Sequence, residues 1–493
     1  MRLHHLFAVS VSCALIFWCF TRSATAADLS LGRQIILDRG LQIQSLGFVD
    51  STPLAPTSYS QWANANFTTF SSWYDTNSEK KLVWTMPWSR WMRTDGTNPL
   101  TNNEMNQHLD ELVSLQYGDE LNQDLTGSID ATTLSTMAST YASWHSLYGN
   151  NFLAHTNFGA NNASKTMSAS GLASYMAATN PDMLLFDAYP RHFVTLTTWY
   201  TEMQKYRVAG LAGIDGTGNK PIPYGQYLDL YRTSYSASVP EESFVRMQES
   251  VSWAFGYTFV TAFVYNKPNN ATVFPALFAS DGDSNPTAVL GYVAEANRQG
   301  RNLGPALTRL TSTDIRMIPG PGHDLPGGVL RWTPGAGGNS FISNITPTNS
   351  AGGSASSSYS DIFIGYFEPL LADNSAYPFA DGTHFMIVNA ASSGSAAGKA
   401  QWYHINFDFS SGDATAQGFD SLQILRRESG QIDVIPLTHL TGAQYFLDWN
   451  LEGGTGDLFR FWNSSLPEPG ALGMVALALG ALMRRRIRRQ RTN

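Results

Sequence analysis

Short apolar runs alternate with longer amphipathic stretches from Asp28 to Ser312. Several runs are continuously apolar, which is typical of parallel strands covered on both faces. The stretches between them repeat apolar residues at helical spacing, as Leu196, Trp199 and Met203 do. The eight predicted strands are Leu41–Phe48, Phe67–Tyr74, Lys81–Trp88, Leu112–Asp119, Phe152–Phe158, Met183–Tyr189, Lys220–Gln226 and Tyr257–Tyr265.

Eight strand–helix units over this length predict a (β/α)8 TIM-type barrel for residues 27–312. A doubly wound open sheet is the alternative. No Gly-x-Gly-x-x-Gly follows the first predicted strand, which disfavours a dinucleotide-binding version of that sheet.

The pattern changes after Ile315. The stretches Pro319–Gly322 and Gly335–Ser358 have loop compositions. Short alternating runs lie beyond them, and short strands separated by turn residues predict an all-β sandwich for residues 313–463. The predicted strands of this domain are Ile362–Phe367, His384–Val388, Tyr403–Phe409, Ser421–Arg426, Ile432–Leu437 and Leu458–Trp462.

The N-terminus has the order of a secretory signal. Arg2 precedes an apolar run from Leu6 to Phe20, and Ala24-Thr25-Ala26 follows at a plausible cleavage point. The run is shorter than the roughly 20 residues of a membrane span. A signal peptide over residues 1–26 is therefore predicted, with a buried N-terminal helix as the less favoured alternative.

The C-terminal segment, residues 464–493, has three parts. Pro467-Glu468-Pro469 precedes an apolar stretch from Ala471 to Met483, and a cluster of six arginines follows. This order closely resembles the PEP-CTERM sorting signal. The resemblance implies export to the cell envelope or beyond, transient anchoring in the inner membrane through the tail, and recognition and removal of the tail by an exosortase as partner.

Composition restricts the chemistry of the core. Cys13 and Cys19 are the only cysteines, and both lie in the predicted signal peptide, which excludes disulfides and thiol chemistry in the mature chain. The chain's net charge of -8 includes the arginines of both ends, so the segment between them is more acidic still. Because phosphate binding needs a basic surface, no nucleic-acid partner is expected. We expect neither a cofactor nor a metal, since no Walker A loop, Gly-x-Ser-x-Gly elbow or His-Glu-x-x-His motif is present.

Carboxylates accompany aromatic residues at the predicted strand ends, where the reacting groups of a barrel lie. Glu120 is the candidate acid/base, with Asp119 beside it and Asp187 as the partner carboxylate. Cleaving a glycosidic bond requires one carboxylic acid to protonate the leaving oxygen and a second carboxylate to attack, stabilise or activate water. Each of the three could instead be a cap or a structural hydrogen-bonding residue. The candidate substrate-binding residues are Trp73, Trp88, Tyr117, Asn157, Tyr189 and Gln226.

The layout resembles bacterial barrel glycoside hydrolases of the beta-galactosidase and cellulase-like kind. The segments that carry the resemblance are Gly40–Gln44, Tyr117–Glu120 and Pro181–Pro190. It implies an acid/base glutamate after strand four and a nucleophilic glutamate at the end of strand seven. The predicted strand seven ends at Gln226, which cannot act as a carboxylate nucleophile.

Three hypotheses follow from this departure. The first is an exported glycoside hydrolase acting on an extracellular polysaccharide or oligosaccharide, with Asp187 as the second carboxylate or with an inverting mechanism. The second is a catalytically inactive carbohydrate-binding protein on the same scaffold. The third is a structural envelope protein, for which no aromatic cleft is expected.

Overall fold

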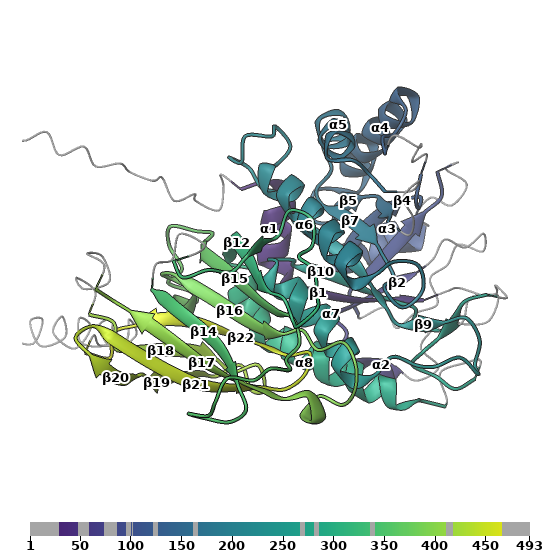
Figure 1. Cartoon of the computed structure of the whole chain (residues 1–493). Coiled ribbons are helices and arrows are strands. Elements are labelled where there is room, and N and C mark those ends of the chain that lie inside the picture. Colours follow the sequence, from purple (N-terminus) through teal and green to yellow (C-terminus); the bar gives the residue numbers. More distant parts are fainter. Residues whose placement is uncertain are drawn as a thin grey trace, which may run out of the picture.

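The computed structural model of the chain describes residues 29–47, 59–72, 86–94, 100, 102–121, 127–160, 166–266, 272–280, 285–335, 341–410 and 418–465. Its N-terminal part is a parallel sheet surrounded by helices, and its C-terminal part consists of antiparallel sheets (Figure 1). Apart from Ser464 and Ser465, both predicted sorting signals lie outside the described residues. Among the helices that are described, none is long and apolar enough to cross a membrane.

The parallel sheet has nine strands in the order β5-β4-β3-β2-β1-β10-β8-β7-β6. Its strands are β1 (Gln42–Gly47), β2 (Thr69–Ser72), β3 (Trp88–Met92), β4 (Leu112–Tyr117), β5 (Leu153–His155), β6 (Asn157–Gly159), β7 (Leu184–Asp187), β8 (Tyr224–Asp229) and β10 (Phe259–Phe263). All of its strand pairs are parallel.

The two strands at the ends of this order, β5 and β6, belong to one extended segment. Only Thr156 separates them. β5 pairs with β4 through Gln116 and His155, and β6 pairs with β7 through Asn157 and Leu185. The segment therefore closes the sheet on itself. Counted as one strand, β5 and β6 together with the other seven form an eight-stranded parallel barrel. The predicted TIM-type arrangement is confirmed at this level, and the open-sheet alternative is wrong.

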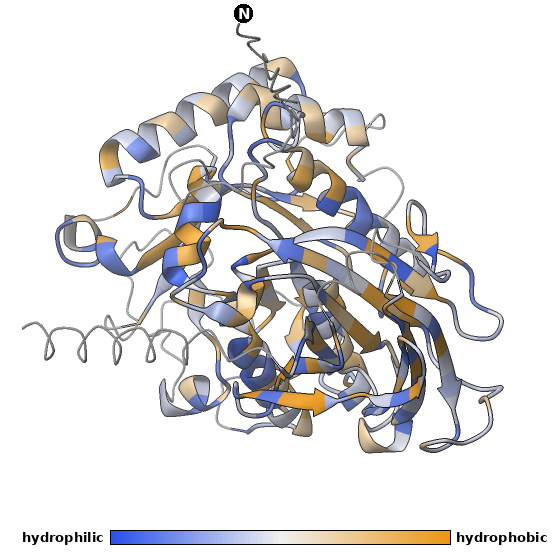
Figure 2. Cartoon of the chain, turned by 90° about the vertical axis from the view of Figure 1, so that its left-hand side faces the viewer, coloured by the Kyte–Doolittle hydropathy of each residue, from blue (hydrophilic) through white to orange (hydrophobic). Residues whose placement is uncertain are grey.

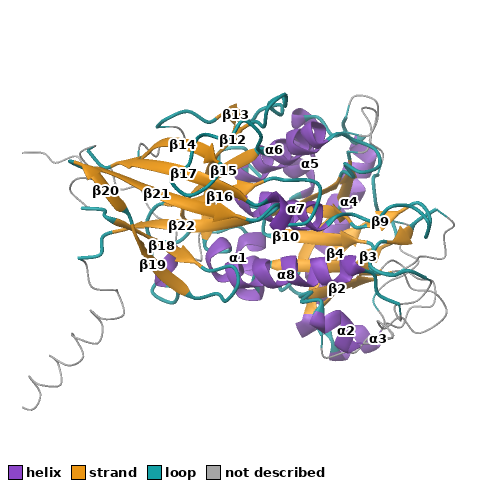
Figure 3. Ribbon diagram, turned by 60° about the horizontal axis from the view of Figure 1, so that its bottom comes forward, coloured by secondary structure: helices purple, strands orange, loops and turns teal. Residues whose placement is uncertain are grey.

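Helices alternate with the strands along the chain, as in a β/α barrel (Figures 1 and 3). They are α1 (Leu31–Arg39), α2 (Tyr59–Asn64), α3 (Asn102–Gln107), the 3-10 turn η2 (Leu109–Glu111), α4 (Ala131–Tyr148), α5 (Ala169–Thr179), α6 (Leu196–Ala212), α7 (Glu242–Ala254) and α8 (Ala288–Leu307). Several begin at a residue whose side chain accepts a backbone N–H, including Asp130 before α4 and Thr195 before α6. Such caps satisfy donors that the first turn of a helix leaves unpaired.

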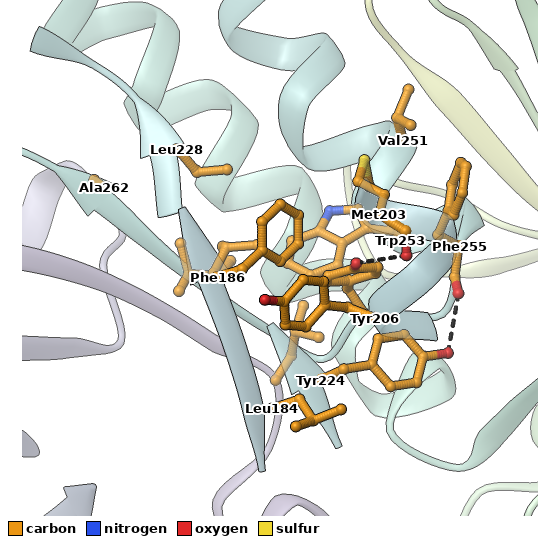
Figure 4. Close-up of a cluster of buried hydrophobic side chains, with 14 of the residues drawn as sticks. Leu184, Phe186, Met203, Tyr206, Tyr224, Leu228, Val251, Trp253, Phe255 and Ala262 are labelled. Carbon is orange, nitrogen blue, oxygen red and sulfur yellow. Dashed lines mark hydrogen bonds between the residues drawn. The ribbon is translucent and has the colours of Figure 1, made fainter. Parts of the chain in front are cut away.

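Alternation along each strand separates two cores. Outward side chains such as Phe186 and Tyr224 pack with helix residues such as Trp253 in a large cluster between the strands and the helices (Figure 4). Inward side chains such as Leu46 and Leu185 fill the barrel itself. Hydrophobic and hydrophilic residues are mixed along both the helices and the strands in the view of Figure 2. Burying a large apolar side chain contributes about 1.5–3 kcal/mol, so these two cores hold the barrel together.

The C-terminal part has a seven-stranded sheet, β13-β12-β15-β16-β22-β18-β19, and a four-stranded sheet, β14-β17-β21-β20. Side chains from both sheets, among them Ile364, Phe385 and Tyr403, share one hydrophobic cluster. The strands are β12 (Leu310–Ile318), β13 (Leu330–Arg331), β14 (Ile342–Thr348), β15 (Ile362–Pro369), β16 (His384–Asn389), β17 (Gln401–Asp408), β18 (Ser421–Leu425), β19 (Ile432–Pro436), β20 (Thr438–Thr441), β21 (Gln444–Leu451) and β22 (Gly456–Trp462), with short turns η4 (Pro378–Ala380) and η5 (Ala397–Lys399).

The seven-stranded sheet packs directly on α7. A Cβ atom at Gly365 in β15 would lie 2.1 Å from the carbonyl oxygen of Ala254, so only glycine permits this close approach. The Phe363 ring contacts Tyr200 and Phe255 at centroid distances of 4.7 and 5.5 Å. At the edge of this contact, the guanidinium of Arg246 in α7 pairs with the carboxylate of Glu452, which follows β21, at 3.0 Å. The seven-stranded sheet is thus joined to the barrel by close apolar packing with an ion pair at its edge.

Two predicted strand boundaries and one predicted loop are wrong. The third strand begins at Trp88 instead of ending there, and the seventh runs to Asp229 instead of ending at Gln226. The stretch predicted as loop between Gly335 and Ser358 contains β14. Buried polar residues caused the strand errors, because side chains such as Ser89 and Gln226 interrupt the apolar run by which a buried strand is recognised. Strand β12 begins at Leu310, slightly before the predicted domain boundary.

The buried carboxyl group of Glu249 in α7 makes stability depend on pH. Its oxygen Oε2 is buried without a hydrogen-bond partner among the described residues, and burial raises its pKa to about 8. The folded protein therefore keeps this carboxyl neutral while the unfolded chain ionises it. We expect the free energy of unfolding to fall by about 1.4 kcal/mol per pH unit between about pH 5 and pH 8 through this group. Urea unfolding of wild type and Glu249→Gln at several pH values tests this, because the variant should lack that slope. Equal slopes would contradict the assignment.

Gln226 is a structural residue of the barrel wall. Its side chain is fully buried, accepts the Trp199 indole N–H at 2.8 Å and donates to the Ser252 hydroxyl at 2.6 Å. An ionised glutamate in its place could not donate to Ser252 and would bury an unpaired charge, so we expect Gln226→Glu to reduce the free energy of unfolding by about 2–4 kcal/mol. Gln431→Glu at an exposed position is the control and should change it little. An unchanged melting temperature for Gln226→Glu would contradict this placement.

Candidate functional site

A cavity of about 460 Å³ opens at the carboxyl ends of the barrel strands. Its volume is in the range of small-molecule binding sites. It is lined by Leu46, Trp91, Asp119, Glu120, Asn157, Asp187, Tyr189, Phe193, Tyr227, Tyr231, Thr233, Phe263, Thr272 and Val273. Three of these residues carry carboxylates and six are aromatic, so charged groups and ring faces share one recess.

The turn after β4 places two of the carboxylates. Gly118 and Glu120 both adopt left-handed backbone conformations, with φ of 59° and 45°. A non-glycine residue in this region is strained, and such strain gathers at functional sites. The Glu120 N–H donates to the Asn157 carbonyl at 3.1 Å, which ties the turn to β6. The turn therefore holds Asp119 and Glu120 over the mouth of the barrel.

The Glu120 side chain lies against Gly159 in β6. A Cβ atom at position 159 would lie 2.5 Å from the Glu120 oxygen Oε1. Any larger residue would displace this carboxylate, so glycine at the end of β6 is part of the site's construction.

The amide of Asn157 joins the other two carboxylates. Its Nδ2 donates to Oδ1 of Asp119 at 2.7 Å and to Oδ1 of Asp187 at 3.2 Å. These two bonds place the carboxylate oxygens no more than about 6 Å apart. Asp119 follows β4 and Asp187 ends β7, so Asn157 on the strand between them spans the gap.

Asp119 also belongs to a hydrogen-bond chain from the opposite side of the barrel. The Tyr227 hydroxyl donates to Gln116 Oε1 at 2.7 Å. Gln116 Nε2 then donates to the Gly118 carbonyl at 2.9 Å and approaches Oδ1 of Asp119 at 3.5 Å. Amide N–H groups aimed at a carboxylate favour its ionised form. The chain therefore both fixes the strained turn and supports a charged Asp119.

Aromatic rings form the wall facing the carboxylates. Phe263 at the end of β10 contacts Tyr189 and Tyr231 at centroid distances of 5.3 and 5.2 Å. Tyr189 meets Tyr231 edge to face at 5.2 Å. Tyr231 belongs to β9 (Tyr231–Arg232), which pairs with β11 (Phe274–Pro275) in a small antiparallel sheet. Phe193 is 60% exposed and stands at the rim.

Three tyrosines beside the carboxylates remain protonated at neutral pH. Burial raises the pKa of Tyr189 well above its usual value, and the charge of Asp187 raises it further. Burial, Asp119 and Asp187 act on the pKa of Tyr227 in the same direction. Burial raises the pKa of Tyr231 most, and the charge of Asp229 raises it further. The phenols of Tyr189 and Tyr231 can therefore donate hydrogen bonds in the cavity, whereas the Tyr227 hydroxyl already donates to Gln116.

A neutral histidine lies in the barrel interior below the cavity. His155 in β5 comes two residues before Asn157 and is 2% exposed. Burial lowers its pKa to about 3, so the imidazole is uncharged. The ring meets Phe259 edge to face at 6.0 Å and adds no positive charge to the site.

The structure brings five of the predicted residues together, namely Asp119, Glu120, Asp187, Asn157 and Tyr189. It places three others elsewhere. Trp88 is buried at the start of β3 and donates to the His108 carbonyl, Tyr117 faces outward against Tyr141 and Trp144, and Gln226 faces α6 and α7. Their predicted role in substrate binding is corrected by this geometry, because none of the three lines the cavity. Trp73 lies outside the described residues.

The sequence interpretation misses most of the aromatic wall. Tyr227 is absent from it because the predicted seventh strand ends one residue before this ring. Tyr231, Thr233, Thr272 and Val273 lie on or beside the small β9–β11 sheet, which has no recognisable local pattern. Trp91 and Phe263 lie near the ends of β3 and β10. With the correct strand boundaries, the alternation of side chains along a strand would have predicted that both rings point into the barrel.

The seventh strand does end in a carboxylate, Asp229. It is fully buried and accepts the Arg191 N–H at 2.9 Å, with His192 Nε2 at 3.3 Å. It thereby anchors the loop after β7. This carboxylate does not line the cavity, so its role is to position the Tyr189–Phe193 segment.

Among the described residues, no three or more His, Cys, Asp or Glu side chains are grouped so that they could hold a metal ion. The cavity's own side chains offer carboxyl groups, which can attack, give up a proton or take one, and phenols, which can donate hydrogen bonds.

Comparison with known proteins gave structural similarity alone. No protein-family model matches the chain, and no curated protein matches it in sequence. A glycoside hydrolase family 5 structure from Bacteroides vulgatus is 8% identical with a TM-score of 0.41, covering 86% of this chain and 90% of that one. The endo-beta-1,4-mannanase from Thermotoga petrophila is 9% identical with a TM-score of 0.36, covering 84% and 92%. The alpha-galactosidase of Saccharomyces cerevisiae is 8% identical with a TM-score of 0.35, covering 90% and 96%.

Proposed function

We propose that the chain is a glycoside hydrolase whose reacting groups are the Asp119 and Asp187 carboxyls. The observation that carries the proposal is the Asn157 amide, which holds one oxygen of each carboxyl within about 6 Å of the other in an aromatic-walled cavity. Two carboxyls this close repel each other when both are ionised, so the pair takes up a proton more readily than either carboxyl alone. Glycosidic cleavage uses such a pair, one carboxyl as the proton donor and the other in its ionised form.

The hydrogen bonds assign the two roles. Asp119 receives the shorter bond from Asn157 and faces the Gln116 amide, which favours its charged form. In the first step Asp119 attacks the anomeric carbon while the glycosidic C–O bond breaks and the leaving oxygen takes the proton of Asp187. In the second step water gives a proton to Asp187 and its oxygen displaces Asp119 from the anomeric carbon.

Glu120 has a different part in this proposal. Its carboxylate lies in the same cavity but over β6, against Gly159. We assign it to binding sugar hydroxyls, with the neighbouring tyrosine hydroxyls as further partners. The rings of Tyr189, Tyr231 and Phe263 offer apolar faces to the C–H surfaces of a sugar.

The other hypotheses have less support. The inactive binding protein rested on Gln226 as the terminal residue of the seventh strand, and Gln226 lies in the barrel wall away from the cavity. The structural envelope protein was expected to lack an aromatic cleft, whereas the cavity is walled by aromatic rings.

The first test is sugar release from a panel of soluble polysaccharides and oligosaccharides by the chain without its two predicted sorting signals. We expect Asp119→Asn and Asp187→Asn to lose activity by about 10²–10⁴-fold, because each removes a reacting group. Glu120→Gln should lose less. Asp324→Asn, at an exposed position away from the cavity, is the matched control and should keep full activity. Melting temperatures check folding. A larger loss in Glu120→Gln than in Asp187→Asn would contradict the assigned pair.

The stereochemistry of the first product tests the same pair independently. Carboxyl groups about 5–5.5 Å apart retain the anomeric configuration, and groups about 6.5–9.5 Å apart invert it. We expect retention, read by proton NMR in the first minutes of reaction, and rescue of Asp119→Ala by azide. An inverted product would contradict a direct attack by Asp119, and a fully inactive wild type would contradict the proposed function.

We further propose that the protein is exported and sorted to the cell envelope, with a β-sandwich as its C-terminal module. The support is the signal-like segment before Ala27 and the PEP-CTERM-like tail after Ser465. In a bacterium that has an exosortase, the wild type should reach the envelope or medium with a shortened C-terminus. The Pro467→Ala/Glu468→Ala/Pro469→Ala variant should stay in the membrane fraction, as immunoblots of cell fractions would show. Cytoplasmic wild type would contradict the proposal.

A further inference from the structure

The four-stranded sheet has an outer face whose side chains differ from those of an ordinary solvated strand. In β17 the residues Tyr403, Ile405 and Phe407 point into the core shared by the two sheets. The alternate residues of β17 and β21 therefore point outward. We call six of them the outer sheet face: Trp402, His404 and Asn406 on β17, with Asn450, Asp448 and Phe446 opposite them on β21.

This face is directed away from the barrel. The seven-stranded sheet packs on α7 through Phe363 and Gly365, and the four-stranded sheet lies on its other side (Figures 1 and 3). The outer sheet face is thus separated from the carboxylate cavity by a whole layer of the structure. A ligand on it would not compete with a ligand in the cavity.

Side chains on the face are held in place by one another. His404 Nδ1 bonds to Asp448 Oδ1 at 2.8 Å, and the His404 ring lies 4.8 Å from the Phe446 ring. The side chains of His404 and Asp448 are 29% and 18% exposed, so both are partly accessible to solvent. A Cβ atom at Gly352, in the turn after β14, would lie 4.0 Å from Oδ2 of Asp448.

The rings follow one line along β17 and β21. Trp402 lies two residues from His404, a rise of about 7 Å along a strand, and Phe446 lies one strand across. Amide and carboxyl groups of Asn406, Asp448 and Asn450 stand between and beside the rings. The result is a platform of partly exposed rings with hydrogen-bonding groups beside them.

We propose that the outer sheet face binds a neutral glycan chain and forms a second carbohydrate site separate from the cavity. Flat rings pack on the C–H faces of sugars, and amides and carboxylates bond to their hydroxyls. The outward positions of β17 and β21 include two aspartates and no lysine or arginine. This charge does not complement an anionic ligand such as nucleic acid or an acidic lipid. The absence of aliphatic side chains at these positions does not suit a hydrophobic protein partner.

Native gel electrophoresis in the presence of polysaccharide tests the proposal. The probes are mixed-linkage β-glucan, glucomannan, xylan and soluble starch, and Asp119→Asn serves as the background so that the probe is not degraded. We expect at least one probe to retard this protein, and Trp402→Ala and Phe446→Ala each to weaken the retardation about 10-fold. Tyr59→Ala, an exposed ring on α2, is the matched control and should behave as the background does.

Folding and site identity are checked with further variants. Trp402→Phe keeps a ring and should keep most of the binding, which separates loss of the platform from loss of fold. Tyr189→Ala alters the cavity and should leave the retardation intact. Retardation that disappears in Tyr189→Ala but survives in Trp402→Ala would overturn the proposal, as would no retardation by any probe. A dimer that Trp402→Ala dissociates would also overturn it, in favour of an interface between two copies. The assay measures binding and not catalysis. Its result can therefore be interpreted even if the protein proves not to be a hydrolase.

Discussion

Closure of the barrel by the segment from Leu153 to Gly159 is the constraint on which the site depends. The segment breaks at Thr156, whose hydroxyl donates to the Tyr117 carbonyl at 2.6 Å and so replaces part of the interrupted ladder. On one side of the break the chain pairs with β4, and on the other with β7. Asn157 follows the break directly, which is why its amide lies between a carboxylate after β4 and another at the end of β7. The same seven residues close the sheet and assemble the candidate reacting groups.

Several polar side chains in the barrel interior have defined hydrogen-bond partners. Gln44 donates to Ser89, Ser114 donates to the same hydroxyl, and Tyr227 donates to Gln116. A buried polar group without such a partner costs about 1–3 kcal/mol, so this network determines which side chains the interior can accept. Gln116 in turn donates to the Gly118 carbonyl in the strained turn that carries the two neighbouring carboxylates. The barrel core is therefore both a stabilising element and the support of the cavity.

The architecture is accessible from the sequence, whereas much of the site is not. Continuous apolar runs separated by helical stretches predict a parallel barrel, and carboxylates at strand ends lead to Asp119, Glu120 and Asp187. The pattern cannot locate strand ends where buried residues are polar, and this is why Trp88 and Gln226 are predicted at the mouth. Tyr117 fails for another reason, because one residue decides which side of a strand a ring occupies. Tyr231 belongs to a small sheet formed between distant loops, and Thr272 lies just before its second strand, so no local sequence pattern indicates either residue.

The division of the chain into two packed parts gives the two proposed carbohydrate sites different physical demands. Cleavage requires carboxyls held in a recess, and at the barrel mouth burial raises the pKa of the neighbouring Tyr189 and Tyr227. Holding a long polymer requires instead an open surface that tolerates sliding and many registers. A flat antiparallel sheet offers such a surface, because alternate residues form a regular outward row at no cost to the core beneath. The sheet packed on α7 is the layer that separates these two environments and joins them through its contacts with the barrel.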